Sequence, residues 1–145
     1  MEDMQSLCHT VWDCKYHVVW IPEYRKKVLY GKLRGELGPV IREPARQKEC
    51  EVVEGKLVVD HVHALLSVPP EYSVARVIGF IKGKSAIYVA RMSGRRRSFV
   101  GQSFWARGYY VSTVGLDEAA IRAYIQTQEE TDRKLDQMKL FEKDR

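Results

Sequence analysis

Two histidines, His61 and His63, are separated by one residue in an apolar run that is typical of a β-strand. Side chains alternate along a strand, so both imidazoles are expected on one face, directed to the same region. Two imidazole nitrogens form half of a metal site. The pair by itself is equally compatible with surface histidines or with core histidines that are hydrogen-bonded locally.

Tyr124 and Gln128 offer a second pair of functional groups near the end of the chain. Residues four apart share one face of a helix. A tyrosine hydroxyl is a possible nucleophile, and the glutamine carbonyl is a hard oxygen donor. Two imidazoles and one amide oxygen suit Mg²⁺ or Mn²⁺ better than a closed structural Zn²⁺ site. Alternatively, Tyr124 is an ordinary residue of an amphipathic helix and Gln128 is solvated.

The positive charge of the chain is concentrated in one long stretch. The net charge is +5, and no acidic residue lies between Glu71 and Asp117. Cations attract phosphates, and the aromatic residues interspersed there can stack on unpaired bases. The stretch predicts a nucleic-acid interface, although a solvated basic face over core aromatics is the alternative. The cations that we expect at DNA phosphates are Lys82, Lys84, Arg95, Arg96, Arg97, Arg107 and, in an earlier basic cluster, Arg25.

Length and composition predict one domain over residues 1–145, with an N-terminal tail at 1–8 and a polar, helical C-terminal tail at 130–145. Three cysteines without a Cys-x-x-Cys spacing indicate reduced thiols in a cytoplasmic protein. The N-terminus is polar and acidic, unlike a signal peptide, and no apolar run is long enough for a membrane span.

The hydrophobic pattern predicts the element order β-α-β-β-α-β-α. Without the last helix this is the ferredoxin-like (RRM-like) α+β arrangement, an antiparallel sheet with two helices on one face. The first helix is expected to be broken or kinked, because Pro39 and Pro44 lie inside it. His61 and His63 are expected on the other, open face, where the C-terminal helix can dock. The predicted elements are strands 12–21, 50–59, 61–68 and 105–114, and helices 32–49, 73–92 (capped by Ser73) and from Asp117 onward.

Several motifs in order along the chain carry a family resemblance. They are Trp12–His17, Pro22–Arg25, Asp60–His63, Gly79–Ser85 and Phe104–Val111, together with Tyr124 and Gln128. In this combination the chain resembles the single-tyrosine HUH (His-hydrophobic-His) transposases of small bacterial and archaeal insertion sequences, the insertion-sequence-200/605 type. The likeness extends from about residue 7 to about residue 130.

The resemblance implies a complete catalytic set. His61, His63 and Gln128 would hold one Mg²⁺ or Mn²⁺ per site, and Tyr124 would attack single-stranded DNA, leaving a 5′-phosphotyrosine and a free 3′-OH. The covalent link conserves the phosphodiester's energy, so rejoining would need no nucleotide cofactor. The resemblance further implies a homodimer with composite active sites, recognition of DNA hairpins near the element ends, and no membrane partner.

Two other classes of function stay open at this point. A ferredoxin-like sheet with exposed aromatics can bind RNA without chemistry or divalent metal. A small metal-binding structural or regulatory protein would use the histidine pair but would not need the basic stretch. A domesticated transposase relative, which cuts DNA without moving an element, is a variant of the transposase hypothesis. His9 and His17 are expected to be structural, and Tyr16, Tyr109 and Tyr110 to be core or stacking residues.

Overall fold

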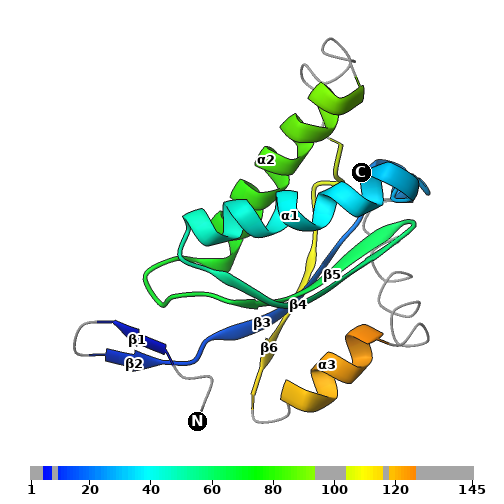
Figure 1. The fold of residues 1–145 in the computed structure, drawn as a ribbon. Helices are drawn as coiled ribbons and strands as arrows, with labels where there is room; N and C mark the ends of the chain where they lie inside the picture. The colour runs from blue at the N-terminus through cyan, green and yellow to red at the C-terminus, as the bar shows by residue number, and fades with distance from the viewer. Residues whose placement is uncertain (1–4, 8–9, 94–103, 116–117, 127–145) are drawn as a thin grey trace.

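The computed structural model describes residues 5–7, 10–93, 104–115 and 118–126, in which a four-stranded antiparallel sheet has helices on both sides (Figure 1). The strands of this sheet lie in the order β4-β5-β3-β6, and a separate hairpin joins β1 and β2. Helices α1 and α2 cover one face of the sheet, and α3 lies against the other. The elements are β1 (Gln5–Leu7), β2 (Thr10–Trp12), β3 (Lys15–Trp20), the 3-10 turn η1 (Glu23–Arg25), α1 (Gly31–Gln47), β4 (Glu51–Val58), β5 (His61–Ser67), α2 (Val74–Ser93), β6 (Tyr110–Val114) and α3 (Glu118–Gln126).

The α+β, ferredoxin-like prediction is confirmed by this topology. The central strands β3 and β5 pair with each other, and β4 and β6 form the edges. The predicted hairpin of residues 50–59 and 61–68 is present as β4 and β5. The cap predicted at Ser73 is also present, since its hydroxyl oxygen accepts a hydrogen bond from the Arg76 amide at 3.1 Å.

The first helix differs from its prediction, because α1 is continuous from Gly31 to Gln47 despite Pro39 and Pro44. Its buried residues, Leu37, Ile41, Pro44 and Ala45, recur with helical spacing and pack in the core. Burial of these apolar side chains offsets the loss of the two backbone hydrogen bonds that the prolines cannot donate.

The strand predicted at 12–21 is divided into β2 and β3, because β2 leaves the main sheet to pair with β1. Residues 5–7, expected in an N-terminal tail, are therefore part of a hairpin.

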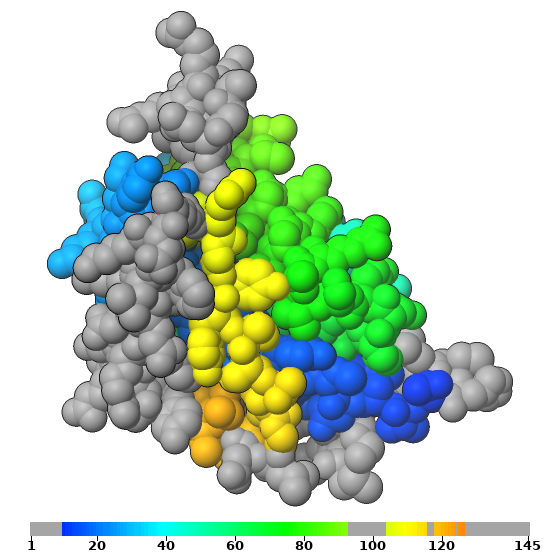
Figure 2. Space-filling view, turned by 180° about the vertical axis from the view of Figure 1, so that it is seen from behind, coloured from blue at the N-terminus to red at the C-terminus, as the bar shows by residue number. Residues whose placement is uncertain are grey.

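The strand predicted at 105–114 begins only at Tyr110. Residues 106–108 direct their carbonyls to the Lys82 ammonium instead, at 2.6, 3.0 and 3.3 Å. Figure 2 shows residues 104–115, in yellow, along the length of the rear face. The predicted Asp117 cap lies outside the described residues.

The core lies between the sheet and the helices α1 and α2. Val18 and Trp20 of β3 and Val62, Ala64 and Leu66 of β5 all point into it. Trp105 meets Trp20 edge-on, with ring centroids 6.1 Å apart. Within the described residues, no helix has both the length and the apolar character that crossing a membrane requires. Cys14 and Cys50 are free thiols, and Cys8 lies outside the described residues.

One hydrogen-bond chain in this core can be tested. The Trp105 indole Nε1 donates to Ser85 Oγ at 2.9 Å, and Ser85 Oγ donates to the Ile81 carbonyl at 2.7 Å. We expect Ser85→Ala to lower the free energy of unfolding by about 1–3 kcal/mol, because it leaves a buried indole N–H without its acceptor. In urea denaturation, Ser85→Ala combined with Trp105→Phe should cost less than the two single changes together. Strict additivity would contradict this coupling.

Candidate active site

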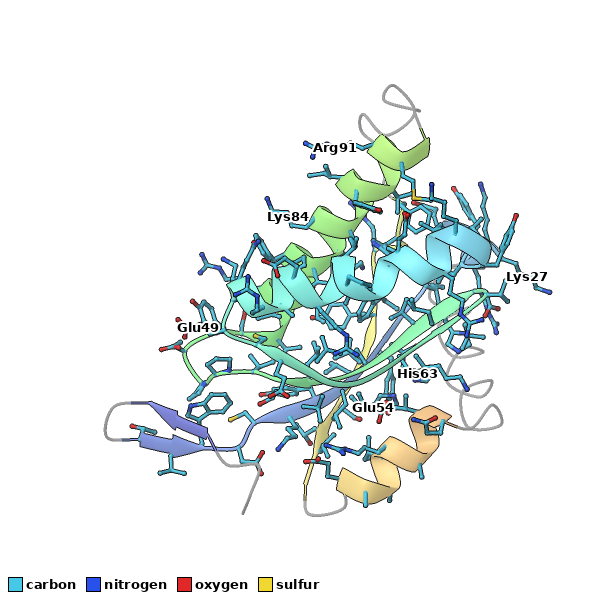
Figure 3. All side chains as sticks on the ribbon, viewed as in Figure 1. Lys27, Glu49, Glu54, His63, Lys84 and Arg91 are labelled. Carbon is cyan, nitrogen blue, oxygen red and sulfur yellow. The ribbon has the colours of Figure 1, made fainter. Side chains whose placement is uncertain are left out.

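Three histidines, not two, meet on the sheet face opposite α1 and α2. His61 and His63 lie on β5, and His17 lies on β3. The register pairs Val19 with His63, so His17 is the diagonal neighbour of His63 on the same face. All three are buried, with exposed fractions of 0–2%. Figure 3 shows His63 beneath the sheet, on the side where α3 lies. The predicted face is therefore right, and α3 contacts the sheet on this side, as expected of the C-terminal helix.

His17 and His63 form a direct hydrogen bond, with 2.9 Å between Nε2 of His17 and Nδ1 of His63. The ring centroids are 5.2 Å apart and the planes differ by 13°, as expected for two nearly coplanar rings that meet edge to edge. One of the two nitrogens must carry the proton and the other must accept it. If Nε2 of His63 binds a cation, its proton must be on Nδ1, and His17 is then the acceptor.

His61 is oriented by a carboxylate. Its Nδ1 lies 2.7 Å from Asp60 Oδ1, and Arg25 Nε donates to Asp60 Oδ2 at 2.9 Å. Burial by itself would raise the pKa of Asp60, but the hydrogen bond from His61 and the charge of Arg25 outweigh it, and the net pKa is lowered. An ionised Asp60 can only accept, so the proton of a neutral His61 is on Nδ1. This is the arrangement by which carboxylates orient metal-binding histidines.

The two hydrogen bonds identify the nitrogens that could hold a cation. With Nδ1 of each ring engaged, His61 and His63 would offer Nε2, and both Nε2 atoms are buried. The ring centroids of the two are 4.9 Å apart. Across the described part of the chain, no group of three or more His, Cys, Asp or Glu side chains could hold a metal ion. A complete site here would therefore need a ligand of another type or one from outside the described residues, where the predicted Gln128 lies.

Helix α3 is held on this face by a buried ammonium. Lys15 Nζ lies 2.5 Å from Asp13 Oδ1 and 3.1 Å from Glu118 Oε1 at the start of α3. Burial lowers the pKa of Lys15, but the hydrogen bonds to Asp13 and Glu118 raise it more, so the net pKa is raised. At the other end of α3, Lys56 Nζ donates to the Gln126 carbonyl at 3.2 Å, and Ile125 is fully buried.

The predicted nucleophile, Tyr124, belongs to α3 and so lies on the helix that contacts β5, although its side chain is outside what the structure describes. Arg95, Arg96 and Arg97 also lie outside the described residues. The helix that contains Tyr124 and the strand that carries His61 and His63 thus lie on one sheet face, and side-chain geometry is given only for the two histidines; Gln128 lies outside the described residues.

Of the side chains predicted to contact DNA phosphates, four belong to described residues: two of these have partners within the protein and two are exposed. Arg25 binds Asp60, and Lys82 binds the carbonyls of 106–108. Lys84 is exposed on α2, on the side of the sheet away from His63 (Figure 3), and Arg107 is exposed in the loop before β6. Arg25 and Lys82 thus have structural partners, and their DNA contacts stay predictions.

Sequence reasoning treated His17 as a structural residue and missed its hydrogen bond to His63. His17 is 46 residues from His63 in the chain, and only the antiparallel register brings them together. Strand alternation puts Lys15, His17 and Val19 on one face, which is the signal that could have revealed this contact. The side chain that orients His61 was also missed, although Asp60 directly precedes it in the chain.

Comparisons with known proteins decide the family. The family model described as "Transposase IS200 like" matches residues 10–128, which is most of the chain. This chain belongs to the IS200-like transposases. Family membership implies a DNA-cleaving and strand-transferring activity, and it confirms the resemblance to the 200/605-type single-tyrosine transposases.

Relatives of this transposase are similar over nearly its whole length. The transposase for insertion sequence element IS200 of Salmonella typhimurium is 39% identical over 141 residues, covering 97% of this chain and 93% of the relative. The ISDra2 transposase TnpA of Deinococcus radiodurans is 32% identical over 121 residues, covering 81% of this chain and 86% of the relative.

Solved structures support the same fold. A Deinococcus radiodurans protein assigned as a transposase superposes with a TM-score of 0.69 at 28% identity, covering 85% of this chain and 96% of that one. A REP-associated tyrosine transposase, bound to a REP hairpin, superposes with a TM-score of 0.54 at 13% identity, covering 83% of this chain and 68% of that one. At that identity, the second likeness concerns the fold alone.

The anchoring of α3 generates one prediction. Lys15→Met keeps the apolar stem but removes the ammonium, so we expect faster hydrogen exchange in α3 and a loss of about 1–3 kcal/mol in the free energy of unfolding. Because the folded-state pKa of Lys15 is raised, its ion pairs stabilise the fold wherever Lys15 is charged and its carboxylate partners are ionised, and this stabilisation is lost as the pH rises through the raised lysine value. Wild type and variant should differ at about pH 8 and converge in strong alkali. Lys84→Met, at an exposed position, is the control. Equal α3 exchange in both variants would contradict the role of Lys15.

The hydrogen bond between His17 and His63 generates a second prediction. If His63 Nε2 takes part in a divalent site, His17→Phe should weaken Mn²⁺ binding by about 10–100-fold, because it removes the acceptor that orients His63. His17→Gln restores an acceptor oxygen near the position of Nε2 and should recover most of the affinity. Titration calorimetry on the full chain measures both. Wild-type affinity in His17→Phe would show that His63 needs no such partner.

Proposed function

We propose that this transposase cleaves and rejoins single-stranded DNA through a covalent bond to Tyr124. The observation that carries the proposal is the histidine pair of β5, oriented by Asp60 and His17, on the sheet face contacted by the helix that contains Tyr124. The helix that contains Tyr124 and the nitrogens proposed to bind a cation thus lie on one face of the sheet, although Tyr124 is 61 residues from His63 in the chain.

In the proposed reaction the Tyr124 oxygen attacks the scissile phosphorus. The new oxygen–phosphorus bond forms as the bond to the 3′ oxygen breaks, giving a 5′-phosphotyrosine and a 3′-OH. Free tyrosine has a pKa of about 10, so the hydroxyl must be activated at neutral pH. Rejoining reverses the step, with a 3′-OH attacking the phosphotyrosine, and consumes no nucleotide.

His61, His63 and Gln128 would hold one Mg²⁺ or Mn²⁺, which when bound would polarise the phosphodiester and neutralise developing charge. The described residues fit a divalent cation in part: with Nδ1 engaged, each of the two imidazoles can offer Nε2, and an oxygen ligand such as the Gln128 carbonyl would supply the donor type that Mg²⁺ and Mn²⁺ prefer. Asp60 and His17 orient the two rings, and Arg25 keeps Asp60 ionised.

We further propose DNA hairpins as the recognised ligand and a homodimer as the active unit. A structural relative is bound to a REP hairpin, which supports hairpin recognition. In a composite site, α3 of one subunit would serve the histidines of its partner. Such an exchange would transfer to the partner the contacts that Lys15 and Lys56 make with α3 on its own sheet. An RNA-binding module or a metal-binding structural protein, the two alternatives, would not belong to this family.

The test is covalent capture of DNA. Single-stranded oligonucleotides that tile the DNA flanking this gene, incubated with the protein and Mg²⁺ or Mn²⁺, should yield an adduct on a denaturing gel. Tyr124→Phe should abolish the adduct and leave hairpin binding nearly unchanged, because only the hydroxyl is lost. Chelation of the metal should abolish it as well.

The matched control is Tyr110→Phe. Tyr110 is the tyrosine whose ring lies 5.9 Å from that of His17, and it is therefore the rival nucleophile among the described residues. We expect Tyr110→Phe to retain the adduct. An adduct that persists in Tyr124→Phe and disappears in Tyr110→Phe would transfer the role to Tyr110.

A further inference from the structure

The segment from Pro22 to Tyr30, between β3 and α1, presents two exposed aromatic rings. Tyr24 is 73% exposed and Tyr30 is 65% exposed. Among the aromatic residues that the structure describes, only these two are largely exposed to solvent. Exposed aromatic rings beside cations are the usual means of holding unpaired bases.

The backbone at Tyr24 has an unusual conformation. Tyr24 has φ 59° and ψ 20°, and Arg25 follows with φ 52°, so two consecutive residues lie in the left-handed region. Glycine adopts this conformation without steric cost, whereas a bulky aromatic residue does not. Residues held in this region often mark functional sites. A tyrosine in this conformation is therefore a candidate functional residue.

Surrounding hydrogen bonds hold the turn in place. The Arg25 amide donates to the Pro22 carbonyl at 2.8 Å, and the Glu23 amide donates to the Phe104 carbonyl at 2.9 Å. On the far side of the turn, the Leu29 amide donates to the Val59 carbonyl at 2.9 Å. Tyr24 is thus presented by a rigid segment.

The same turn is joined to the histidine site. Arg25, next to Tyr24, binds Asp60, and Asp60 binds Nδ1 of His61. Two exposed cations, Lys26 and Lys27, follow in the chain. Figure 3 shows Lys27 extending outward where α1 begins and the β4–β5 hairpin turns. The aromatic ring, the cations and the edge of the site are therefore neighbours.

From this arrangement we infer that Tyr24 is a stacking platform for an unpaired DNA base near the scissile phosphate, with Lys26 and Lys27 at the adjoining backbone phosphates. The inference rests on the proposed single-stranded substrate and adds a binding subsite to it. Every base has a π face, so the platform favours single strands over duplex without reading sequence.

The first test distinguishes contacts to DNA bases from contacts to the DNA backbone. Fluorescence anisotropy is measured for the full chain with an oligothymidylate of about ten nucleotides and with an abasic strand of equal length. Tyr24→Ala should weaken oligothymidylate binding by at least about fivefold and leave abasic binding unchanged. Lys27→Ala should weaken binding to both strands alike, because a cation contacts phosphates only.

The second test uses the backbone conformation. Tyr24→Gly removes both the ring and the strain, so it should keep or raise the melting temperature while it loses base-dependent binding. Glu49→Gly is the matched control, since Glu49 has φ 58° and lies at the opposite end of α1 from Lys27 (Figure 3). It should relieve strain in the same way and keep base-dependent binding.

Three results would overturn the inference: equal binding of both strands by the wild type, unchanged base dependence in Tyr24→Ala, or a lower melting temperature in Tyr24→Gly. Each is distinct from failure of the proposed chemistry. If the wild type forms the Tyr124 adduct while Tyr24→Ala binds both strands normally, only the platform is wrong. If Tyr24→Ala loses base-dependent binding and no adduct ever forms, the platform stands without the chemistry.

Discussion

The antiparallel register of β3 and β5 is the constraint on which the site depends. It pairs Val19 with His63, and it makes His17 the diagonal neighbour of His63. Because strand side chains alternate, a shift of one residue would carry His17 to the opposite face, among the apolar side chains below α1 and α2. The core on that face, with Val18, Trp20, Val62 and Ala64, therefore keeps the histidines together by specifying the register.

Burial makes the partners of the histidines important. An imidazole removed from water is costly unless its polar atoms are hydrogen-bonded. Asp60 is hydrogen-bonded to Nδ1 of His61, and His17 is hydrogen-bonded to Nδ1 of His63. These bonds leave Nε2 as the nitrogen with which each ring could bind a cation. The same contacts that stabilise the folded chain thus prepare the site chemically. Arg25 extends this network to the turn that carries Tyr24.

Much of the fold could be predicted because its signals are local. Alternation identified the strands, the Ser73 cap and periodicity identified α2, and the element order indicated the ferredoxin-like sheet. The errors arose where tertiary contacts outweighed local preference. Core burial keeps α1 continuous through Pro39 and Pro44, and Lys82 draws the carbonyls of residues 106–108 away from strand pairing. Neither effect has a signal within its own segment.

The sequence by itself determined the family, the facing pair His61 and His63, and the helix that bears Tyr124, because motif order and strand or helix periodicity are properties of the chain alone. Only the tertiary structure decided that His17 is hydrogen-bonded to His63, that Arg25 forms an ion pair with Asp60, and that Lys15 forms an ion pair with Glu118 of α3. These contacts join residues from separate elements. Register, docking and burial select them, and no spacing along the chain specifies any of the three.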